Sequence, residues 1–174
     1  MKKLILLFIL LGFIQQGFAQ KFIRETDKET GLVLLRGQIT FEDIANETHH
    51  AWFMKNAKRY EPNLDVIDEL APLLKKYHIV VFLGTWCGDT KDLLPKFYTT
   101  IRECNFDMNG VQLFGVNRAK EAINIESKLF NIIRVPTFIV MDQYREVGRI
   151  TEMVDKSIEE DLLRIVSKDA ANRN

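Results

Sequence analysis

The stretch that most constrains the fold is a continuous apolar run over residues 79–84, followed by Trp86, Cys87 and a helical pattern. An apolar run of this length, without alternating polar residues, predicts a central strand that is covered on both faces. Cys87 would then lie at the carboxyl end of that strand and at the amino end of a helix, where open α/β sheets place their sites. The unpaired N–H groups and partial positive charge of a helix start favour a thiolate over a thiol.

The rest of the chain alternates between strand and helix patterns, which predicts an α/β protein. We expect strands over residues 31–39, 79–84, 111–116, 137–142 and 146–151, and helices over residues 41–60, 64–77, 89–104, 119–132 and 155–170. Thr40 and Asp43 resemble a capping box before the first helix, and Asp155 or Ser157 can cap the last one. The last two strands form a β-hairpin, so the sheet is mixed.

Residues 1–19 have the features of a secretory signal peptide. Two lysines precede an apolar run over residues 4–14, and Gly17 and Ala19 are the small residues of a cleavage site. The apolar run is too short to span a bilayer comfortably, and Gln20 stands where a lipid anchor would need a cysteine. We therefore expect cleavage after Ala19 and a periplasmic or secreted protein that has no membrane segment once it is cleaved.

The composition is that of one ordinary globular domain. The chain has 174 residues, of which 47% are hydrophobic and 28% charged. The formal net charge is zero, which gives no electrostatic basis for binding nucleic acid or an anionic membrane. We expect a monomer with one domain over residues 20–174, in which a strand and helices over residues 20–77 precede a core over residues 78–169.

The segment around Cys87 resembles the active site of the thioredoxin-like family. That family's motif is Trp-Cys-Gly-Pro-Cys-Lys, with a helix-kinking proline eight residues after the first cysteine, and Pro95 has this spacing from Cys87. Residues 134–140 are similar to the family's second motif, in which a cis-proline faces the thiol. The resemblance implies a three-layer sandwich with a mixed central sheet flanked by helices, and a cis peptide bond before Pro136.

The resemblance also implies a substrate-binding surface beside the Cys87 thiol, which would be the nucleophile. This surface comprises Trp86, Gly88, Asp89, Val135 and Pro136. Three residues depart from the family's pattern: Thr90 stands in place of the resolving cysteine, Asp89 in place of the motif proline, and Val81 in place of a buried acid. The Thr90 hydroxyl can donate a hydrogen bond to the Cys87 thiolate as a second catalytic group, or it can be a neutral replacement.

Cys104 is the other cysteine of the chain, and it lies 17 residues beyond Cys87. Along one helix this is a separation of about 25 Å, whereas a disulfide needs Cα atoms within about 7 Å. The two cysteines should therefore not pair within one molecule. His49 and His50 are adjacent, so they read as a surface pair rather than as ligands of one metal, and no cysteine or histidine cluster has zinc spacing. We expect neither a metal nor a cofactor.

Two functions fit this pattern. The first is an exported thiol:disulfide oxidoreductase that works through Cys87 alone, forms a mixed disulfide with a protein or small-molecule thiol or disulfide, and needs an external thiol to release it. The second is a non-catalytic protein that binds a partner polypeptide in the groove beside Pro136, since backbone pairing there needs no thiol. The sequence does not decide between them.

Overall fold

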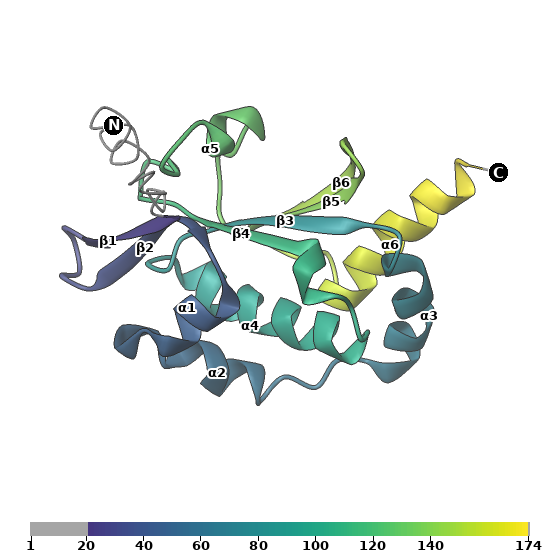
Figure 1. Cartoon of the computed structure of the whole chain (residues 1–174). Helices are drawn as coiled ribbons and strands as arrows, with labels where there is room; N and C mark the ends of the chain where they lie inside the picture. The colour runs from purple at the N-terminus through teal and green to yellow at the C-terminus, as the bar shows by residue number, and fades with distance from the viewer. Residues whose placement is uncertain (1–20, 174) are drawn as a thin grey trace, which may run out of the picture.

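A computed structural model describes residues 21–173 of the chain. Within them, six strands form one sheet in the order β1-β2-β4-β3-β5-β6 (Figure 1). The strands are β1 (Phe22–Thr26), β2 (Val33–Ile39), β3 (His78–Leu83), β4 (Val111–Gly115), β5 (Thr137–Asp142) and β6 (Arg145–Thr151). The helices are α1 (Phe41–Asn46), α2 (Trp52–Ala57), α3 (Leu64–Leu74), α4 (Gly88–Glu103), α5 (Glu126–Leu129) and α6 (Ile158–Ala171), with short 3₁₀ turns at Thr48–His50 and Met108–Gly110.

The sheet is mixed, as the sequence predicts. Strands β3 and β4 are parallel, and each of the other neighbouring pairs is antiparallel. Because parallel strands end at the same edge of a sheet, the segments that follow β3 and β4 meet there. Cys87 follows β3, so this edge contains the candidate site.

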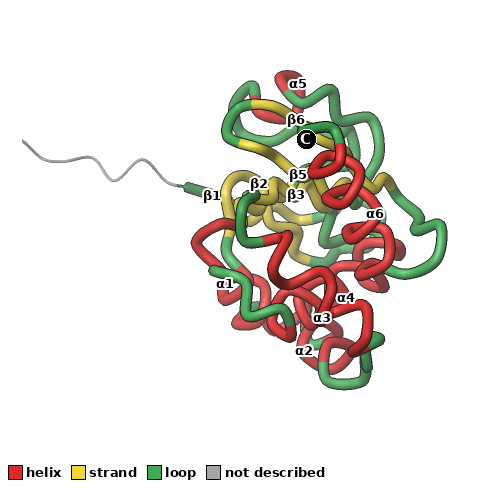
Figure 2. Tube along the Cα trace, turned by 90° about the vertical axis from the view of Figure 1, so that its right-hand side faces the viewer, coloured by secondary structure: helices red, strands yellow, loops and turns green. Residues whose placement is uncertain are grey.

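Helices flank both faces of the sheet, but unequally. Helices α1, α2, α3, α4 and α6 lie on one side and the short α5 on the other (Figures 1 and 2). Alternate residues of β3 serve the two sides: Val81 and Leu83 join the core beneath the larger helix layer, whereas Val80 and Phe82 join a second apolar cluster on the α5 side. The strand is therefore buried on both faces, which explains its unbroken apolar sequence.

Capping residues begin several helices where the sequence places them. The Thr40 hydroxyl accepts a hydrogen bond from the Asp43 N–H, and the Asp43 carboxylate accepts one from the Thr40 N–H, which completes the capping box of α1. Ser157 caps α6 by accepting from the Glu160 N–H. Pro72 lies within the last turn of α3, which continues past it as one helix that ends at Leu74.

The helix predicted over residues 41–60 is wrong as a single element. Glu47 has an extended backbone, with φ −80° and ψ 121°, and this ends α1 before a 3₁₀ turn and α2. The Glu47 carboxylate accepts a hydrogen bond from Arg24 of β1 at 2.9 Å. His50 points inward after this break: its Nε2 lies 3.2 Å from the Val33 carbonyl oxygen, and the residue is 3% exposed. The interpretation of His49 and His50 as a surface pair is therefore wrong for His50.

Two further segments differ from the sequence-based expectation. Strand β1 was not expected; it forms an antiparallel hairpin with β2, which begins at Val33 rather than at residue 31. The helix predicted over residues 119–132 is wrong for most of its length, and Lys120 and Asn131, near its two ends, have positive φ angles of 63° and 52°. Only Glu126–Leu129 is helical. The signal-peptide prediction concerns residues that lie outside the described part of the chain.

None of the helices described between residues 21 and 173 has the length and apolar character needed to cross a bilayer.

Candidate active site at Cys87

Cys87 is the N-cap residue of α4, so the thiol stands at the first turn of a 16-residue helix. The backbone fixes this position from both sides. The Cys87 N–H donates to the Gly84 carbonyl at 2.8 Å, and the Cys87 carbonyl accepts from the Lys91 N–H at 3.1 Å. The cysteine is partly exposed, so a small reagent or an exposed disulfide can reach its sulfur.

The Cys87 sulfur faces the segment that precedes β5. Its Sγ donates to the Val135 carbonyl oxygen at 3.3 Å, and the Val135–Pro136 peptide bond is cis, as the resemblance implies. The Asp89 carboxylate lies 4.0 Å from the same sulfur, from within the first turn of α4. The structure thus brings Cys87, Asp89, Val135 and Pro136 together, although the sequence separates the two pairs by more than forty positions.

Trp86 covers one side of this arrangement. Its indole Nε1–H donates to the Val116 carbonyl at 2.9 Å, and its ring packs with Cys87 against the apolar cluster on the α5 side. Gly84 makes this packing possible, since a Cβ at Gly84 would lie 2.6 Å from Trp86 Cε2. These contacts agree with a structural role for Trp86, in which the ring shields the sulfur.

Gly88 directly follows Cys87 and is the first residue of α4. It is exposed, and a Cβ built on it would meet no heavy atom within 4 Å. A side chain at Gly88 would therefore not press on a neighbouring residue.

Thr90 has a different contact from the one considered in the sequence analysis. It is fully buried, and its hydroxyl oxygen accepts a hydrogen bond from the Gly84 N–H at 3.3 Å. No hydrogen bond joins Thr90 to Cys87 among the contacts of residues 21–173. The threonine thus ties the end of β3 to the first turn of α4.

Two cations lie over the Trp86 ring, and the sequence analysis did not identify either. The Arg118 guanidinium carbon is 4.9 Å from the centroid of this ring, and Lys120 Nζ is 5.7 Å from it. Both residues follow β4, whose parallel pairing with β3 brings the segment after it to the edge at which Cys87 lies. That pairing was the available signal, because both strands were predicted and their carboxyl ends could have been compared.

Cys104 lies at the far end of α4, where it is 2% exposed. Burial raises the pKa of its thiol to about 11. Because α4 is continuous between the two cysteines, the prediction that they do not pair is consistent with the structure, in which both are free. Within residues 21–173, no three His, Cys, Asp or Glu side chains are grouped closely enough to hold a metal ion.

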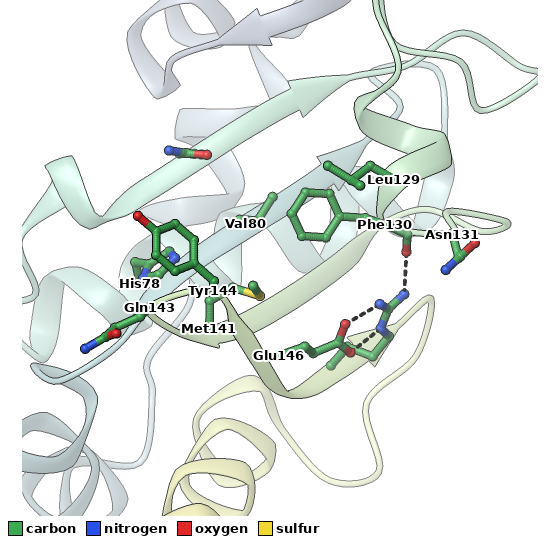
Figure 3. A pocket seen from close by; sticks show the side chains of 11 residues that line it. His78, Val80, Leu129, Phe130, Asn131, Met141, Gln143, Tyr144 and Glu146 are labelled. Atoms are coloured by element: carbon green, nitrogen blue, oxygen red, sulfur yellow. Dashed lines mark hydrogen bonds and ion pairs between the residues drawn. The ribbon is translucent and has the colours of Figure 1, made fainter.

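A hollow of about 790 Å³ lies apart from this site, beside the beginning of β3 at His78 (Figure 3). The rings of Phe130 and Tyr144 stand on either side of Val80, and Arg149 is bound by the Glu146 carboxylate and the Phe130 carbonyl. Cys87 follows the opposite end of the same strand. None of the residues of the candidate site lines this hollow.

No protein-family model and no curated protein matches the chain. Among solved structures, a protein of unknown function from Pseudomonas aeruginosa is similar in fold, with a TM-score of 0.58 and 14% identity over 76% of this chain and 93% of that one. An HIV epitope-scaffold has a TM-score of 0.56 and 14% identity, over 75% of this chain and 93% of the scaffold. Mitochondrial thioredoxin 3 from Saccharomyces cerevisiae has a TM-score of 0.37 and 20% identity, over 59% of this chain and 89% of the thioredoxin.

The first two likenesses concern the fold alone, because both are at 14% identity, and the thioredoxin match, with a TM-score below 0.5, supports no conclusion. The fold class rests on the geometry described above. A mixed sheet has a cysteine at the start of the helix after β3 and a cis-proline directly before β5. The chain therefore has a thioredoxin-like α/β fold, and its candidate site contains one thiol.

Proposed function

We propose that this protein is a thiol:disulfide oxidoreductase that works through Cys87 alone. The observation that supports this most strongly is the position of the sulfur. It is partly exposed at the N-terminus of α4 and faces the Val135 carbonyl beside the cis-proline. A cysteine thiolate is the nucleophile in disulfide exchange, and Cys87 is the thiol that this site offers.

The reaction consists of two exchange steps. In the first, the Cys87 thiolate attacks one sulfur of a substrate disulfide, so that a new S–S bond forms and the other substrate sulfur leaves as a thiolate. In the second, the thiolate of an external thiol attacks the mixed disulfide and releases Cys87. The substrate disulfide is reduced and the external thiol is oxidised, while Cys87 returns to its starting state.

An external thiol is required because the chain offers no second sulfur at the site. Thr90 occupies the position of a resolving cysteine and is bound to Gly84, whereas Cys104 is buried at the other end of α4. A resolving thiol within the site would act at a very high effective concentration. Without it, the second step is bimolecular and its rate depends on the concentration of the external thiol.

A binding function remains the second candidate, and the surface beside Pro136 favours it. Ile133 and Met153 are 77% and 74% exposed, and they flank the segment in which the Glu152 N–H donates to the Pro136 carbonyl. Exposed apolar side chains beside the cis-proline suit the binding of an extended polypeptide. Under this alternative, Cys87 makes no covalent bond with the partner.

We further propose that the protein acts outside the cytoplasm, in the periplasm or after secretion. The support is the sequence of residues 1–19, with its basic start, apolar run and small residues at the cleavage site. N-terminal sequencing of the exported protein should find Gln20 first. A chain that starts at Met1 in the membrane fraction would contradict this proposal.

The experiment that separates the two functions is partner capture from the exported proteome under non-reducing conditions. A Cys104→Ser variant serves as the background, so that Cys87 is the remaining thiol, and Cys87→Ser in the same background is the matched control. The oxidoreductase should capture partners that dithiothreitol releases, and the control should capture none. A partner that is held equally by both variants, and that dithiothreitol does not release, supports the binding function instead.

A further inference from the structure

His50 is a buried histidine whose two ring nitrogens have different surroundings. The residue is 3% exposed, and its Nε2 lies 3.2 Å from the Val33 carbonyl oxygen. Because a carbonyl oxygen can only accept a hydrogen bond, Nε2 must carry the proton in this contact. Burial lowers the pKa of His50, which favours the neutral ring, so that Nδ1 is an acceptor with a free lone pair.

This Nδ1 atom is buried, and it has no hydrogen-bond partner within residues 21–173. A buried acceptor that is left unpaired costs stability, and such atoms in folded proteins are almost always satisfied by a protein group or by an internal water molecule. The surroundings of the His50 ring therefore have to supply a donor.

A small cavity lies against His50, between the β1–β2 hairpin, the 3₁₀ turn at Thr48–His50 and the segment that follows β3. Its volume is about 20 Å³, which is enough for one water molecule and too small for a larger ligand. Thr85 and Trp86, which directly precede Cys87, are among the residues that line it. A water molecule is stable in such a space when polar groups face it.

Thr85 supplies a second polar group of this cavity. It is 3% exposed, and its hydroxyl oxygen accepts a hydrogen bond from the Leu35 N–H of β2 at 3.3 Å. The hydroxyl hydrogen itself has no acceptor among the contacts of residues 21–173. Thr85 can therefore donate where His50 Nδ1 can only accept, and one water molecule between the two groups can accept from the first and donate to the second.

Other polar side chains of the cavity are less suited to satisfy His50. The Asp27 carboxylate is an acceptor, and it already receives two hydrogen bonds from Arg118, at 2.9 and 2.8 Å, and one from the Thr30 hydroxyl at 2.7 Å. Lys91 also lines the cavity, and its ammonium group is the competing donor to Nδ1 of His50. It would have to leave bulk water to reach a buried imidazole, which is costly for a charged group.

We propose that this cavity is an internal water site, in which one water molecule donates a hydrogen bond to His50 Nδ1 and accepts one from the Thr85 hydroxyl. Because Thr85 is also bound by the Leu35 N–H, the water joins the 3₁₀ turn and β2 to the segment that leads into Cys87. The site does not depend on the proposed function, since no step of disulfide exchange involves it.

The direct test is a crystal structure of the protein at a resolution that shows ordered water, combined with nitrogen NMR of the His50 ring near neutral pH. We expect one ordered water within about 2.7–3.2 Å of both His50 Nδ1 and Thr85 Oγ1, and a neutral ring with its proton on Nε2. A dry cavity, a proton on Nδ1, or Lys91 Nζ within hydrogen-bond distance of Nδ1 would each overturn the proposal.

Three variants test the partners of the water in solution, where a nuclear Overhauser effect between a resident water and the His50 ring protons reports its presence. Thr85→Val removes the hydroxyl at nearly the same shape and should abolish this signal, whereas Thr85→Ser should keep it. Trp52→Phe is the matched control. Trp52 packs against His50 with ring centroids 5.9 Å apart, and its buried Nε1 also has no partner within residues 21–173, but it does not line the cavity.

Trp52→Phe should therefore keep the water signal. Loss of the signal in Trp52→Phe, or its persistence in Thr85→Val, would show that the water has other partners and would overturn the proposal. If Thr85→Val folds poorly, the crystal structure of the parent protein and the Trp52→Phe measurement still decide the question.

Discussion

Gly84 should be the most sensitive glycine of the thiol segment, and the reason is steric. A Cβ at this residue would lie 2.6, 2.8 and 2.9 Å from the Cε2, Nε1 and Cζ2 atoms of Trp86. Real Cβ atoms do not approach other atoms so closely, so Gly84→Ala must displace the indole from its hydrogen bond with the Val116 carbonyl. Gly88→Ala is the matched control, since its Cβ would meet nothing within 4 Å.

The magnitude follows from three contributions. Overpacking of a buried site costs about 1–3 kcal/mol. Loss of the Trp86 hydrogen bond costs about 0.5–1.5 kcal/mol. The lower entropy of alanine in the unfolded chain offsets about 0.4–1 kcal/mol. Gly84→Ala should therefore lower the free energy of unfolding by about 2 kcal/mol, whereas Gly88→Ala should change it by less than about 1 kcal/mol.

Urea unfolding measures this difference, and tryptophan emission reports the displaced ring. The chain has two tryptophans, so a Trp52→Phe background makes Trp86 the one indole observed. Gly84→Ala should shift the emission of the folded protein and Gly88→Ala should not. If the two alanine variants are equally stable and have the same emission, the close contact between Gly84 and Trp86 is not a determinant of the site.

Three other predictions concern buried polar groups. Thr90→Val removes the acceptor for the Gly84 N–H and should lower the free energy of unfolding by about 1–3 kcal/mol, whereas Thr90→Ser should cost less; equal stability in urea would contradict this. Burial lowers the pKa of His50, so the folded protein binds this proton less readily than the unfolded chain, whose value is near 6.5. The stability contributed by neutral His50 is complete above pH 6.5 and is lost as the pH falls below it. His50→Gln should therefore flatten the curve of unfolding free energy against pH in this range. An unchanged slope would contradict a lowered pKa of His50. Because the pKa of Cys104 is raised to about 11, this thiol should react with iodoacetamide at pH 8 only in urea, and reaction in the native protein would contradict its burial.

The central part of the fold could be predicted because its sequence pattern and its burial agree. Strand β3 is apolar throughout and is covered on both faces, and α4 presents apolar residues at helical spacing to one core. The Thr40 capping box and the Ser157 cap are local signals that depend on no distant contact. These elements were therefore accessible from sequence.

The errors arose where a distant or local polar contact overrides periodicity. Glu47 interrupts the helical pattern of residues 41–60 and its carboxylate binds Arg24 of β1, a strand that the sequence analysis did not anticipate. At the start of the helix predicted over residues 119–132, the Asn117 side chain accepts a hydrogen bond from the Glu121 N–H, and Lys120 has a positive φ. A turn therefore stands where a helical turn was expected. A helical pattern alone does not reveal these contacts.

The candidate site was predictable in part. Cys87 and Pro136 were found from motifs, and the structure brings the Cys87 sulfur to the carbonyl directly before Pro136. The destination of Thr90 was not predictable, because its bond with Gly84 depends on how α4 starts relative to β3. Arg118 depends on strand order and on the hairpin that contains Asp27, neither of which the motifs encode.

The most direct test of single-thiol exchange is mass spectrometry of the folded protein after incubation with a small disulfide such as glutathione disulfide. The account predicts one mixed disulfide, located at Cys87 by peptide mapping, absent from Cys87→Ser and released by dithiothreitol. Cys104 should carry no adduct, because it is buried. An unmodified Cys87, under conditions in which the urea-unfolded chain is modified at both cysteines, would contradict the proposed function.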